Sequence, residues 1–413
     1  MPIVSNTSGL LGNTLVIILA GGKGDRLSPL TEERSKPSVP FGGLYRIIDF
    51  TLSNCVNSGM RRAYLLVQYK SFSLERHVQS GWNIFRPDLG EFITCIPPQH
   101  RRSESWYLGT ADAVYQNIYN LKNDKPNRVL ILSGDHIYQM DYGFLLGHHY
   151  MNESDVTLSC LEVELKDAKR FGIVKAQADG RITQFIEKPE NPQPFAHQEQ
   201  SCLASMGVYV FNTDILIEAL ENDALDETSS HDFGNDIIPK LISKARVFAY
   251  PFGERERGQD YWRDIGTIDA YWQAHMELIS PDPPLDLFDY DWPIRTLPEQ
   301  HPPARVMCRQ ENLSDGEGIY NSLLAPGSIV RGGRVVNSFL SPGVEIFPGA
   351  VIEDSILFDD VTVGPGVQVR QAIIDKRNMV LEGENVGVDT RKDQQRYTVS
   401  PGGITVIPKE FIT

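Results

Sequence analysis

The sequence predicts an α/β domain with a mainly parallel sheet, followed by a C-terminal parallel β-helix. Short apolar runs that alternate with helical segments predict the first part. Apolar residues that recur every six positions predict the second part. A stretch rich in proline separates the two patterns. We therefore expect domains at residues 1–280 and 300–413, joined by a linker at 281–299.

The first part begins with a continuous apolar run, Leu15 to Ala20, that stops at the glycine-rich segment Gly21 to Gly24. Such a run is typical of a strand that is buried on both faces and leads into a loop. Similar runs predict further strands at 63–67, 129–132 and 156–161, and the segment 111–121 suits a crossover helix. In open sheets of this kind, ligands lie at the carboxyl ends of the strands.

Beyond the linker, the apolar residues form overlapping six-residue series. They are Leu340, Ile346, Ile352 and Phe358; Leu357, Val363 and Val369; and Val361, Val367 and Ile373. Glycines fall at the intervening corners, where small residues turn a triangular coil. The alternative is a set of short β-hairpins, for which a period of two would be expected. The repeat favours the β-helix, because repeat periodicity is a stronger signal than local propensity.

Composition argues against several classes of protein. The formal net charge of −15 is opposite to the basic surface that a nucleic acid partner requires. No run is long enough to cross a bilayer and the start of the chain lacks the pattern of an export signal, so we expect a cytoplasmic protein without a membrane partner. The cysteines have no paired spacing, which predicts buried, reduced thiols; they are Cys55, Cys95, Cys160, Cys202 and Cys308.

The segment from Leu19 to Leu27, with the Ser-Lys-Pro that ends at Pro37, carries most of the chemical information. Glycines after a buried strand let backbone N–H groups approach a phosphate or a base closely. Lys23, Arg26 and Lys36 supply positive charge that the chain as a whole lacks. The spacing matches neither the P-loop nor the dinucleotide-binding fingerprint.

Two aspartates are candidate metal ligands. Asp135 follows the strand predicted at 129–132, so we expect it at the carboxyl end of that strand. Transfer of phosphoryl or nucleotidyl groups requires Mg²⁺, which takes oxygen ligands from one or two carboxylates. The second candidate is Asp264, in the segment 261–267. The alternative role for Asp135 is a helix N-cap.

The glycine segment with its Lys-Pro resembles the signature of the sugar nucleotidylyltransferases. Further motifs look like those of bacterial glucose-1-phosphate adenylyltransferases over nearly the whole chain. They lie at 41–50, 52–55, 57–59, 106–107, 109–113, 229–234, 261–267 and 291–296. The resemblance implies a Rossmann-like nucleotidyltransferase domain, a left-handed β-helix that packs against it, and a homotetramer.

The resemblance also implies a reaction and a role for each candidate residue. The reaction would transfer the adenylyl group of ATP to α-D-glucose 1-phosphate, giving ADP-glucose and pyrophosphate for glycogen or starch synthesis. Arg26, Lys36 and Asp135 would be catalytic, and Asp135 and Asp264 would hold Mg²⁺. Nucleotide contacts would be Leu19, Ala20, Gly21, Gly22, Gly109 and Thr110, and sugar phosphate contacts Tyr107, Gly172, Glu187, Lys188 and Ser205. Gln68 and Trp106 would lie on loops that couple a regulatory site to the substrate site.

Several alternatives stay open. The chain resembles enzymes that use another nucleotide or sugar, and regulatory subunits that are weakly catalytic. Such subunits lose metal or sugar ligands, whereas Arg26, Lys36, Asp135, Lys188 and Asp264 are all present. A β-helix acyltransferase is a further class, but it would carry a histidine on the coil, and the last histidine is His301. Core packing is the alternative for Trp106 and Tyr107, and a solvated surface pair for Glu187 and Lys188.

The segment after the glycine loop bears on regulation. In relatives activated by fructose 1,6-bisphosphate, a lysine associated with activator binding stands where this chain has Glu33. A carboxylate there would repel a bisphosphate, so we expect an anionic effector and no strong activation by that compound. Arg34, Arg46, Arg391 and Arg396 are candidates for an anion site between the domains, or are solvated surface arginines.

Overall fold

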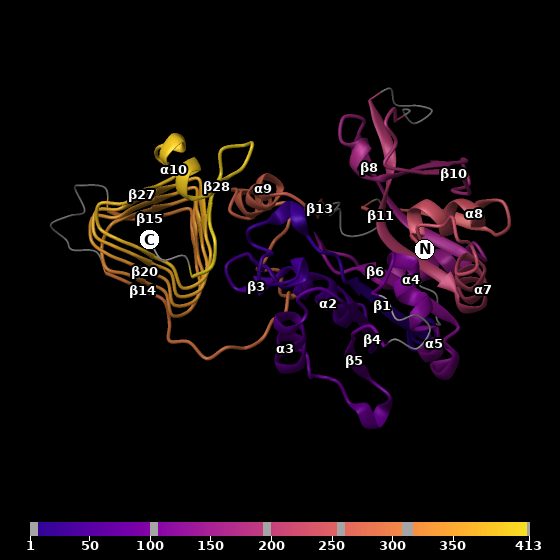
Figure 1. Cartoon of the computed structure of the whole chain (residues 1–413). Helices are drawn as coiled ribbons and strands as arrows, with labels where there is room; N and C mark the ends of the chain where they lie inside the picture. Colours follow the sequence, from indigo (N-terminus) through magenta and orange to yellow (C-terminus); the bar gives the residue numbers. More distant parts are fainter. Residues whose placement is uncertain (1–6, 100–105, 193–199, 254–260, 308–316, 411–413) are drawn as a thin grey trace.

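A computed structural model describes residues 7–99, 106–192, 200–253, 261–307 and 317–410 of the chain. An α/β domain built on a nine-stranded sheet lies beside a coil of short strands that form three sheets (Figure 1). The two parts correspond to the two patterns in the sequence.

The large sheet has the strand order β10-β9-β11-β6-β1-β4-β5, and β8 joins β11 to β12 beside this path. Its strands are β1 (Thr14–Ala20), β4 (Arg62–Val67), β5 (Phe92–Ile96), β6 (Arg128–Ser133), β8 (Val156–Glu164), β9 (Gly172–Ala176), β10 (Ile182–Glu187), β11 (Ser201–Asn212) and β12 (Val247–Pro251). The centre is parallel, because β1 pairs in parallel with β4 and β6, and β4 with β5. The predicted α/β domain is confirmed. The antiparallel β11, which pairs with β6, β8 and β9, was not among the predicted strands.

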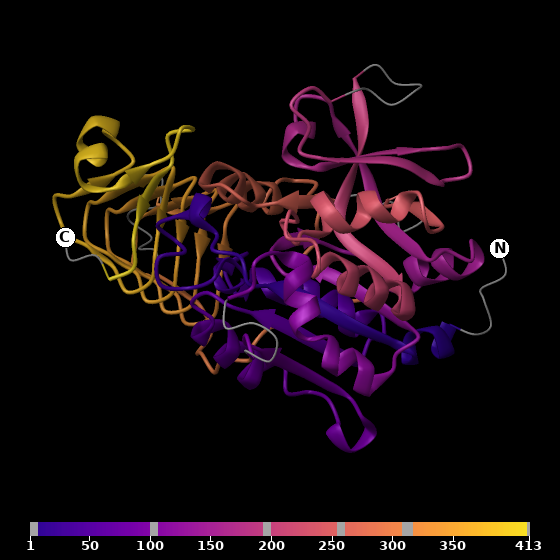
Figure 2. The same cartoon turned by 45° about the vertical axis from the view of Figure 1, so that its right-hand side comes forward.

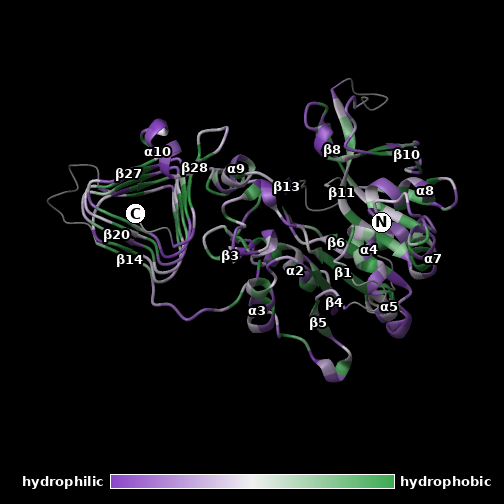
Figure 3. Cartoon of the chain, viewed as in Figure 1, coloured by the Kyte–Doolittle hydropathy of each residue, from purple (hydrophilic) through white to green (hydrophobic). Residues whose placement is uncertain are grey.

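Helices cover both faces of this sheet. They are α1 (Thr7–Gly12), α2 (Ile47–Asn57), α3 (Phe72–Gly81), α4 (Thr110–Gln116), α5 (Ile118–Asp124), α6 (Tyr142–Met151), α7 (Thr213–Asp223) and α8 (Ile238–Ile242). In β1, Leu15 and Ile17 pack into one core with α4 and α7, whereas Val16 and Ile18 pack into another with α2 and α6. A strand buried on both faces must be apolar throughout, and the central strands are mostly green in Figure 3. The predicted crossover helix is in fact two helices, α4 and α5.

The C-terminal part is the predicted left-handed parallel β-helix. Its three sheets follow the orders β14-β17-β20-β23-β26, β15-β18-β21-β24-β27 and β16-β19-β22-β25-β29-β28. The strands are β14 (Arg305–Val306), β15 (Gly318–Tyr320), β16 (Leu323–Leu324), β17 (Ile329–Val330), β18 (Arg334–Val336), β19 (Phe339–Leu340), β20 (Glu345–Ile346), β21 (Val351–Glu353), β22 (Ile356–Leu357), β23 (Thr362–Val363), β24 (Gln368–Arg370), β25 (Ala372–Ile374), β26 (Met379–Val380), β27 (Asn385–Val386), β28 (Thr398–Val399) and β29 (Thr405–Ile407). One further helix, α10 (Thr390–Arg396), lies at the outer end of the coil (Figure 1).

The register of the coil explains the six-residue repeat. Ile346 pairs with Val363, and Ile352 with Val369, so successive turns of the coil are 17 residues apart, or three sides of about six residues. Every residue of the predicted apolar series is buried. Some corners use polar residues instead of glycine. Asn337 has a left-handed backbone with φ 47°, and its Nδ2 donates to Asp354 Oδ1 at 3.1 Å.

The two parts share an apolar core. The helix α9 (Ile268–Leu278) lies between them (Figure 2). Its Tyr271 ring packs against Phe358 of the coil, with centroids 6.5 Å apart, and Trp272 Nε1 donates to the carbonyl of Asp354 at 2.8 Å. Burial lowers the pKa of His275 on the same helix to about 3, so its ring is neutral. The parts are therefore packed together.

The stretch predicted as a linker contains no helix or strand between α9 and β14, but it is not a free tether. Trp292 in this stretch is buried, and its Nε1 donates to Asn54 Oδ1 on α2 at 3.0 Å. Pro293 also accepts a hydrogen bond through its carbonyl, from Asn57 Nδ2 at 3.0 Å. The stretch thus binds α2 of the α/β domain before the coil begins.

The four cysteines in the described residues are free thiols. Cys55, Cys160 and Cys202 are buried as expected, and burial raises the pKa of each thiol. Cys95 is only half-buried, and burial raises its pKa to about 12. Cys308 lies outside the described residues. In the described ranges, no helix has both the length and the apolar character needed to span a membrane.

Candidate active site

The carboxyl end of β1 begins the site. Leu19 and Ala20 end this strand, and Gly134 N donates to the carbonyl of Leu19 at 3.0 Å, which fixes the residue before Asp135 against β1. Gly24 has a φ of +70°, and a Cβ there would lie 3.0 Å from Lys36 Cβ. Glycine is needed at this position for two reasons. The backbone must adopt a left-handed conformation, and it must pack closely against Lys36.

A short antiparallel ribbon brings the two predicted aspartates together. The strand β7 (His136–Tyr138) pairs with β13 (Trp262–Asp264), and His136 lies opposite Asp264. Asp135 directly precedes His136, so both carboxylates lie at one end of the ribbon. Lys36 Nζ donates to Asp135 Oδ2 at 2.9 Å and to Asp264 Oδ1 at 3.1 Å. A helix N-cap role for Asp135 is wrong, because a strand follows it.

All three of these groups are charged at neutral pH. Burial alone would lower the pKa of the Lys36 ammonium, but Asp135 and Asp264 raise it above its ordinary value. Burial alone would raise the pKa of Asp135, but the charges of Lys36 and His136 and a hydrogen bond from Ser133 Oγ lower it far below its usual range. The pKa of Asp264 is lowered against burial in the same way, chiefly by Lys36. Within this cluster of three, the lysine balances one of the two carboxylate charges.

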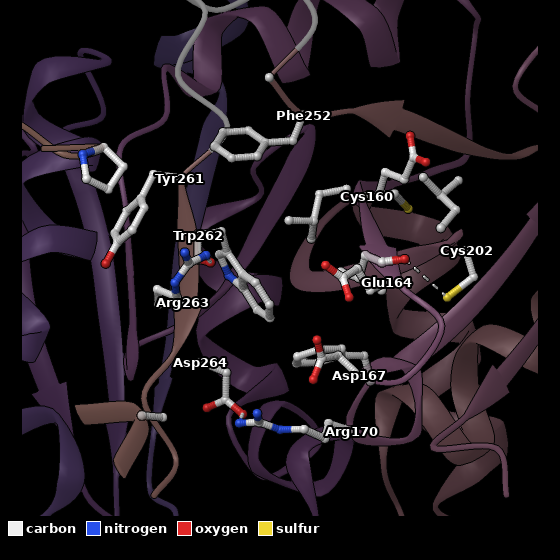
Figure 4. A pocket seen from close by; sticks show the side chains of 18 of the residues that line it. Cys160, Glu164, Asp167, Arg170, Cys202, Phe252, Tyr261, Trp262, Arg263 and Asp264 are labelled. Carbon is white, nitrogen blue, oxygen red and sulfur yellow. Dashed lines mark hydrogen bonds and ion pairs between the residues drawn. The ribbon is translucent and has the colours of Figure 1, made fainter. Parts of the chain in front are cut away.

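Two arginines lie near Asp264. A Cβ on Gly266 would lie 3.1 Å from Arg26 Nη2 and 3.2 Å from Asp264 Oδ1, so the guanidinium and the carboxylate are neighbours across this glycine. Arg170 Nη2 lies 3.9 Å from Asp264 Oδ2, and Figure 4 shows its side chain pointing at the carboxylate. Arg170 was not among the predicted site residues, although it lies two positions before Gly172, a predicted sugar phosphate contact.

Four of the five residues predicted for the sugar phosphate, all except Tyr107, lie on or directly after β9, β10 and β11. Gly172 begins β9 opposite Glu187, which ends β10. A Cβ on Gly172 would lie 2.8 Å from Glu187 Oε2, so the missing side chain makes room for this carboxylate. Lys188 Nζ pairs with Glu187 Oε1 at 2.6 Å, and its side chain is 61% exposed. Ser205 on β11 is buried, and its Oγ lies 3.5 Å from the hydroxyl of Tyr209.

Asp232 connects the nucleotide side to the sugar side. Thr110, the first residue of α4, donates from Oγ1 to Asp232 Oδ2 at 2.8 Å, while Asp232 Oδ1 accepts from Gly234 N at 2.8 Å. A Cβ on Gly234 would lie 2.6 Å from Glu187 Oε2. Thr110 and Glu187 therefore meet at the segment 232–234. Sequence analysis noted this segment as a motif but assigned it no role.

Gln68 and Trp106 lie on neighbouring loops. Gln68 Oε1 accepts from Tyr107 N at 2.7 Å, and Trp106 stacks on Tyr69 with ring centroids 5.1 Å apart. The other partner of the Tyr69 ring is Lys23 of the glycine loop, whose Nζ lies 5.3 Å from the centroid. Trp106 is 53% exposed, so core packing is the wrong interpretation for it. Tyr107 is half-buried, and its hydroxyl accepts from Asn117 Nδ2 at 3.0 Å.

A cavity of about 1430 Å³ opens beside Asp264 (Figure 4). This exceeds the roughly 300–1,000 Å³ that is common for small-molecule sites. Arg170, Phe171 and Trp262 line it with Asp264, which is the only predicted site residue on its wall in the described part of the chain. The buried Trp262 Nε1 has no hydrogen-bond partner among the described residues.

Comparisons with known proteins agree with this arrangement. A nucleotidyl transferase family profile matches residues 15–280, and a profile of the GlmU-like C-terminal hexapeptide region matches 302–407. The chain is 48% identical over 403 residues to glucose-1-phosphate adenylyltransferase 2 of Vibrio cholerae serotype O1, an alignment that covers 97% of this chain and 98% of the relative. The chain belongs to the glucose-1-phosphate adenylyltransferase family. Adenylyltransferases of Rhodopirellula baltica and Dechloromonas aromatica are 47% and 46% identical, with 98% of this chain covered and 92% and 93% of the relatives.

In this adenylyltransferase, the four candidate effector arginines lie in different surroundings. Arg34 is buried at the seam between the two parts, where its Nη2 donates to Asp375 Oδ1 of the coil at 2.9 Å, so it is not a surface residue. Arg46 Nη1 donates to Ser73 Oγ at 2.9 Å. Arg391 and Arg396 are exposed on α10, and Arg396 pairs with Glu384 at 3.1 Å.

The structure also places Glu33 at the seam. Its Oε2 lies 2.7 Å from Lys409 Nζ, near the end of the coil. The hydrogen bond from Lys409 lowers the pKa of Glu33, so the carboxylate stays charged at neutral pH.

Proposed function

We propose that this chain transfers the adenylyl group of ATP to α-D-glucose 1-phosphate, giving ADP-glucose and pyrophosphate for glycogen or starch synthesis. The observation that carries the proposal is the cluster of Asp135, Lys36 and Asp264, which lies between the glycine loop and the sugar-side strands. Such a cluster suits chemistry in which negative charge on phosphate must be held and neutralised. The names of full-length relatives support the choice of ATP and glucose 1-phosphate.

The side chains divide the work between binding and charge neutralisation. An oxygen of the sugar phosphate attacks the α-phosphorus of ATP in line, and the bond to the oxygen of the β-phosphate breaks, so pyrophosphate leaves. Arg26 and Lys36 face the triphosphate and neutralise charge that builds up on it. Lys188 holds the attacking phosphate through a charge-assisted hydrogen bond, and Glu187 accepts hydrogen bonds from sugar hydroxyls. No covalent intermediate is needed, because positioning the two substrates supplies much of the rate.

We propose that Asp135 and Asp264 together hold Mg²⁺. The donor set fits this ion, because Mg²⁺ typically takes one or two carboxylates and completes its shell with water and phosphate oxygens. In the described residues, no group of three or more His, Cys, Asp or Glu side chains forms a complete protein cage, which agrees with a site shared with substrate. When bound, the ion would supply positive charge to the phosphate oxygens.

We also propose a homotetramer, as the resemblance implies, a cytoplasmic location and an anionic effector. The net charge of −15 argues against nucleic acid as a partner.

Pyrophosphate release tests the proposal directly. Purified protein is assayed with Mg²⁺, each nucleoside triphosphate and a panel of sugar 1-phosphates, with Asp135→Asn as the control. The highest kcat/KM is expected with ATP and glucose 1-phosphate. A preference for another pair of substrates would identify a related nucleotidylyltransferase, and no turnover with any pair would favour a regulatory subunit.

A further inference from the structure

His231 lies between the nucleotide side and the sugar side but belongs to neither set of predicted contacts. It stands in the loop between α7 and the short helix η5 (Phe233–Ile237). Its backbone has a φ of +54°, in the left-handed region that residues with a Cβ rarely adopt. Such a conformation persists only where the surrounding contacts hold it.

A buried carboxylate holds this loop. His231 Nδ1 lies 2.8 Å from Asp223 Oδ2, at the end of α7, and the Asp223 side chain is only 4% exposed. The other oxygen, Asp223 Oδ1, accepts from Ser229 Oγ at 2.7 Å. Ser229 Oγ in turn accepts from His231 N at 3.0 Å. Asp223 thus holds the turn 229–231 in two ways. It binds the His231 side chain directly, and it binds the His231 backbone N–H through the Ser229 hydroxyl.

The held carbonyl of His231 determines where α4 begins. It accepts from Ala111 N at 2.8 Å and from Asp112 N at 3.3 Å, which are amides of the first helical turn that have no partner within the helix. Gly109 packs directly on this carbonyl, because a Cβ there would lie only 2.3 Å from His231 O. A displacement of the His231 carbonyl therefore moves Gly109, which precedes α4, and Thr110, which begins it. Both are proposed nucleotide contacts.

We propose that His231 is a positioning residue that, anchored by Asp223, places the Gly109–Thr110 segment for the nucleotide. This inference deepens the proposed function and rests on it. In His231→Ala the contact with Asp223 is lost, and the left-handed backbone no longer has a side-chain anchor. The carbonyl then shifts, and binding of the nucleotide weakens. The sugar side is affected less, because Asp232 Oδ1 still caps Gly234 N and Asn235 N within its own turn.

The test separates nucleotide binding from general stability. For His231→Ala we expect KM for ATP to rise about fivefold or more while KM for glucose 1-phosphate changes less than about twofold. His231→Asn should recover part of the loss, because asparagine tolerates the left-handed region and its amide can donate to Asp223. His231→Gly removes the backbone strain but does not restore the hydrogen bond to Asp223. Binding of ATP should therefore stay weakened in this variant.

Lys240→Ala is the matched control. Lys240 Nζ lies 3.5 Å from Asp223 Oδ1 and 2.8 Å from Asp226 Oδ2, so it approaches the same carboxylate from α8. This variant should leave both KM values unchanged even where its melting temperature falls. Melting temperatures of all variants are measured alongside the initial rates.

Equilibrium titration of ATP distinguishes failure of the inference from failure of the proposed function. Wild-type protein that turns over ATP, together with a His231→Ala variant that binds ATP equally well, would overturn the inference alone. Equal rises in both KM values would also overturn it, because they indicate a general loss of structure. Wild-type protein that neither binds nor turns over ATP would overturn the proposed function, and the inference with it.

Discussion

Replacing Lys36 by methionine tests the charge balance of the site most directly. The change removes an ammonium that lies 2.9 Å and 3.1 Å from two carboxylate oxygens, while keeping a side chain of similar length. Lys36 is 7% exposed and Asp264 is 13% exposed, whereas Asp135 is 31% exposed and partly solvated. Removing one partner from a buried ion pair costs about 3–5 kcal/mol, and the solvation of Asp135 reduces this to about 2–4 kcal/mol.

This loss of stability in Lys36→Met can be measured as a change in melting temperature, and it depends on pH. For a domain of about 270 residues it corresponds to a fall in melting temperature of about 3–7 °C. In the wild type, the lowered carboxylate pKa values contribute stability above the unfolded pKa, which is lost as pH falls through the folded values. In Lys36→Met, burial and mutual repulsion raise both pKa values above the unfolded value. The loss of stability should then shrink between about pH 8 and about pH 5 as the carboxyls take up protons.

Thermal unfolding followed by circular dichroism, with and without Mg²⁺, provides the assay. Mg²⁺ should raise the melting temperature of Lys36→Met more than that of the wild type, because the cation replaces the lost charge. Lys169→Met, which removes an exposed lysine from η4 (Ala168–Arg170), is the control and should change neither quantity. An unchanged melting temperature and an unchanged response to Mg²⁺ in Lys36→Met would refute the reasoning.

Three further predictions concern turnover and regulation. Asp135→Asn should lose ~10²-fold or more in kcat with the fold retained, and near-normal activity at saturating Mg²⁺ would contradict the role of this carboxylate. Lys188→Ala should raise KM for glucose 1-phosphate far more than KM for ATP, because only the sugar phosphate loses a charge-assisted bond; equal effects would mean that the role is misassigned. Titration with fructose 1,6-bisphosphate, against fructose 6-phosphate, pyruvate, 3-phosphoglycerate, AMP and phosphate, should show no strong activation by the bisphosphate, because the charged Glu33 stands at the seam.

Much of the fold could be predicted because burial leaves a direct trace in the sequence. The run at Leu15 is apolar throughout because β1 is covered on both faces. Most members of the six-residue series are apolar because they lie in the core of the coil, whereas Phe358 and Ile373 lie in the core shared with the α/β domain. The strand β11 was harder to recognise, since Ser205 and Gly207 interrupt its apolar pattern. The role of residues 281–299 could not be predicted either, because Trp292 binds Asn54 through a contact that joins distant parts of the chain.

Some residues of the candidate site could also be predicted from the sequence, and others could not. Motifs predict side chains that must meet a ligand directly, such as Lys36 and Asp135, because the chemistry restricts the residue type. They do not predict Arg170, whose position beside Asp264 depends on how two distant segments fold together.

Residues that act through their backbone are more difficult still. The carbonyl of His231 binds the first amides of α4, and every residue has a carbonyl, so the chemistry of this contact restricts no residue type. The residue type at position 231 is restricted in another way. Its side chain must bind the buried Asp223 while its backbone adopts a left-handed conformation. The sequence therefore encodes this part of the site indirectly, in the side chains that anchor the turn. For the same reason, removing the anchor is expected to alter nucleotide binding without removing any atom that contacts the nucleotide.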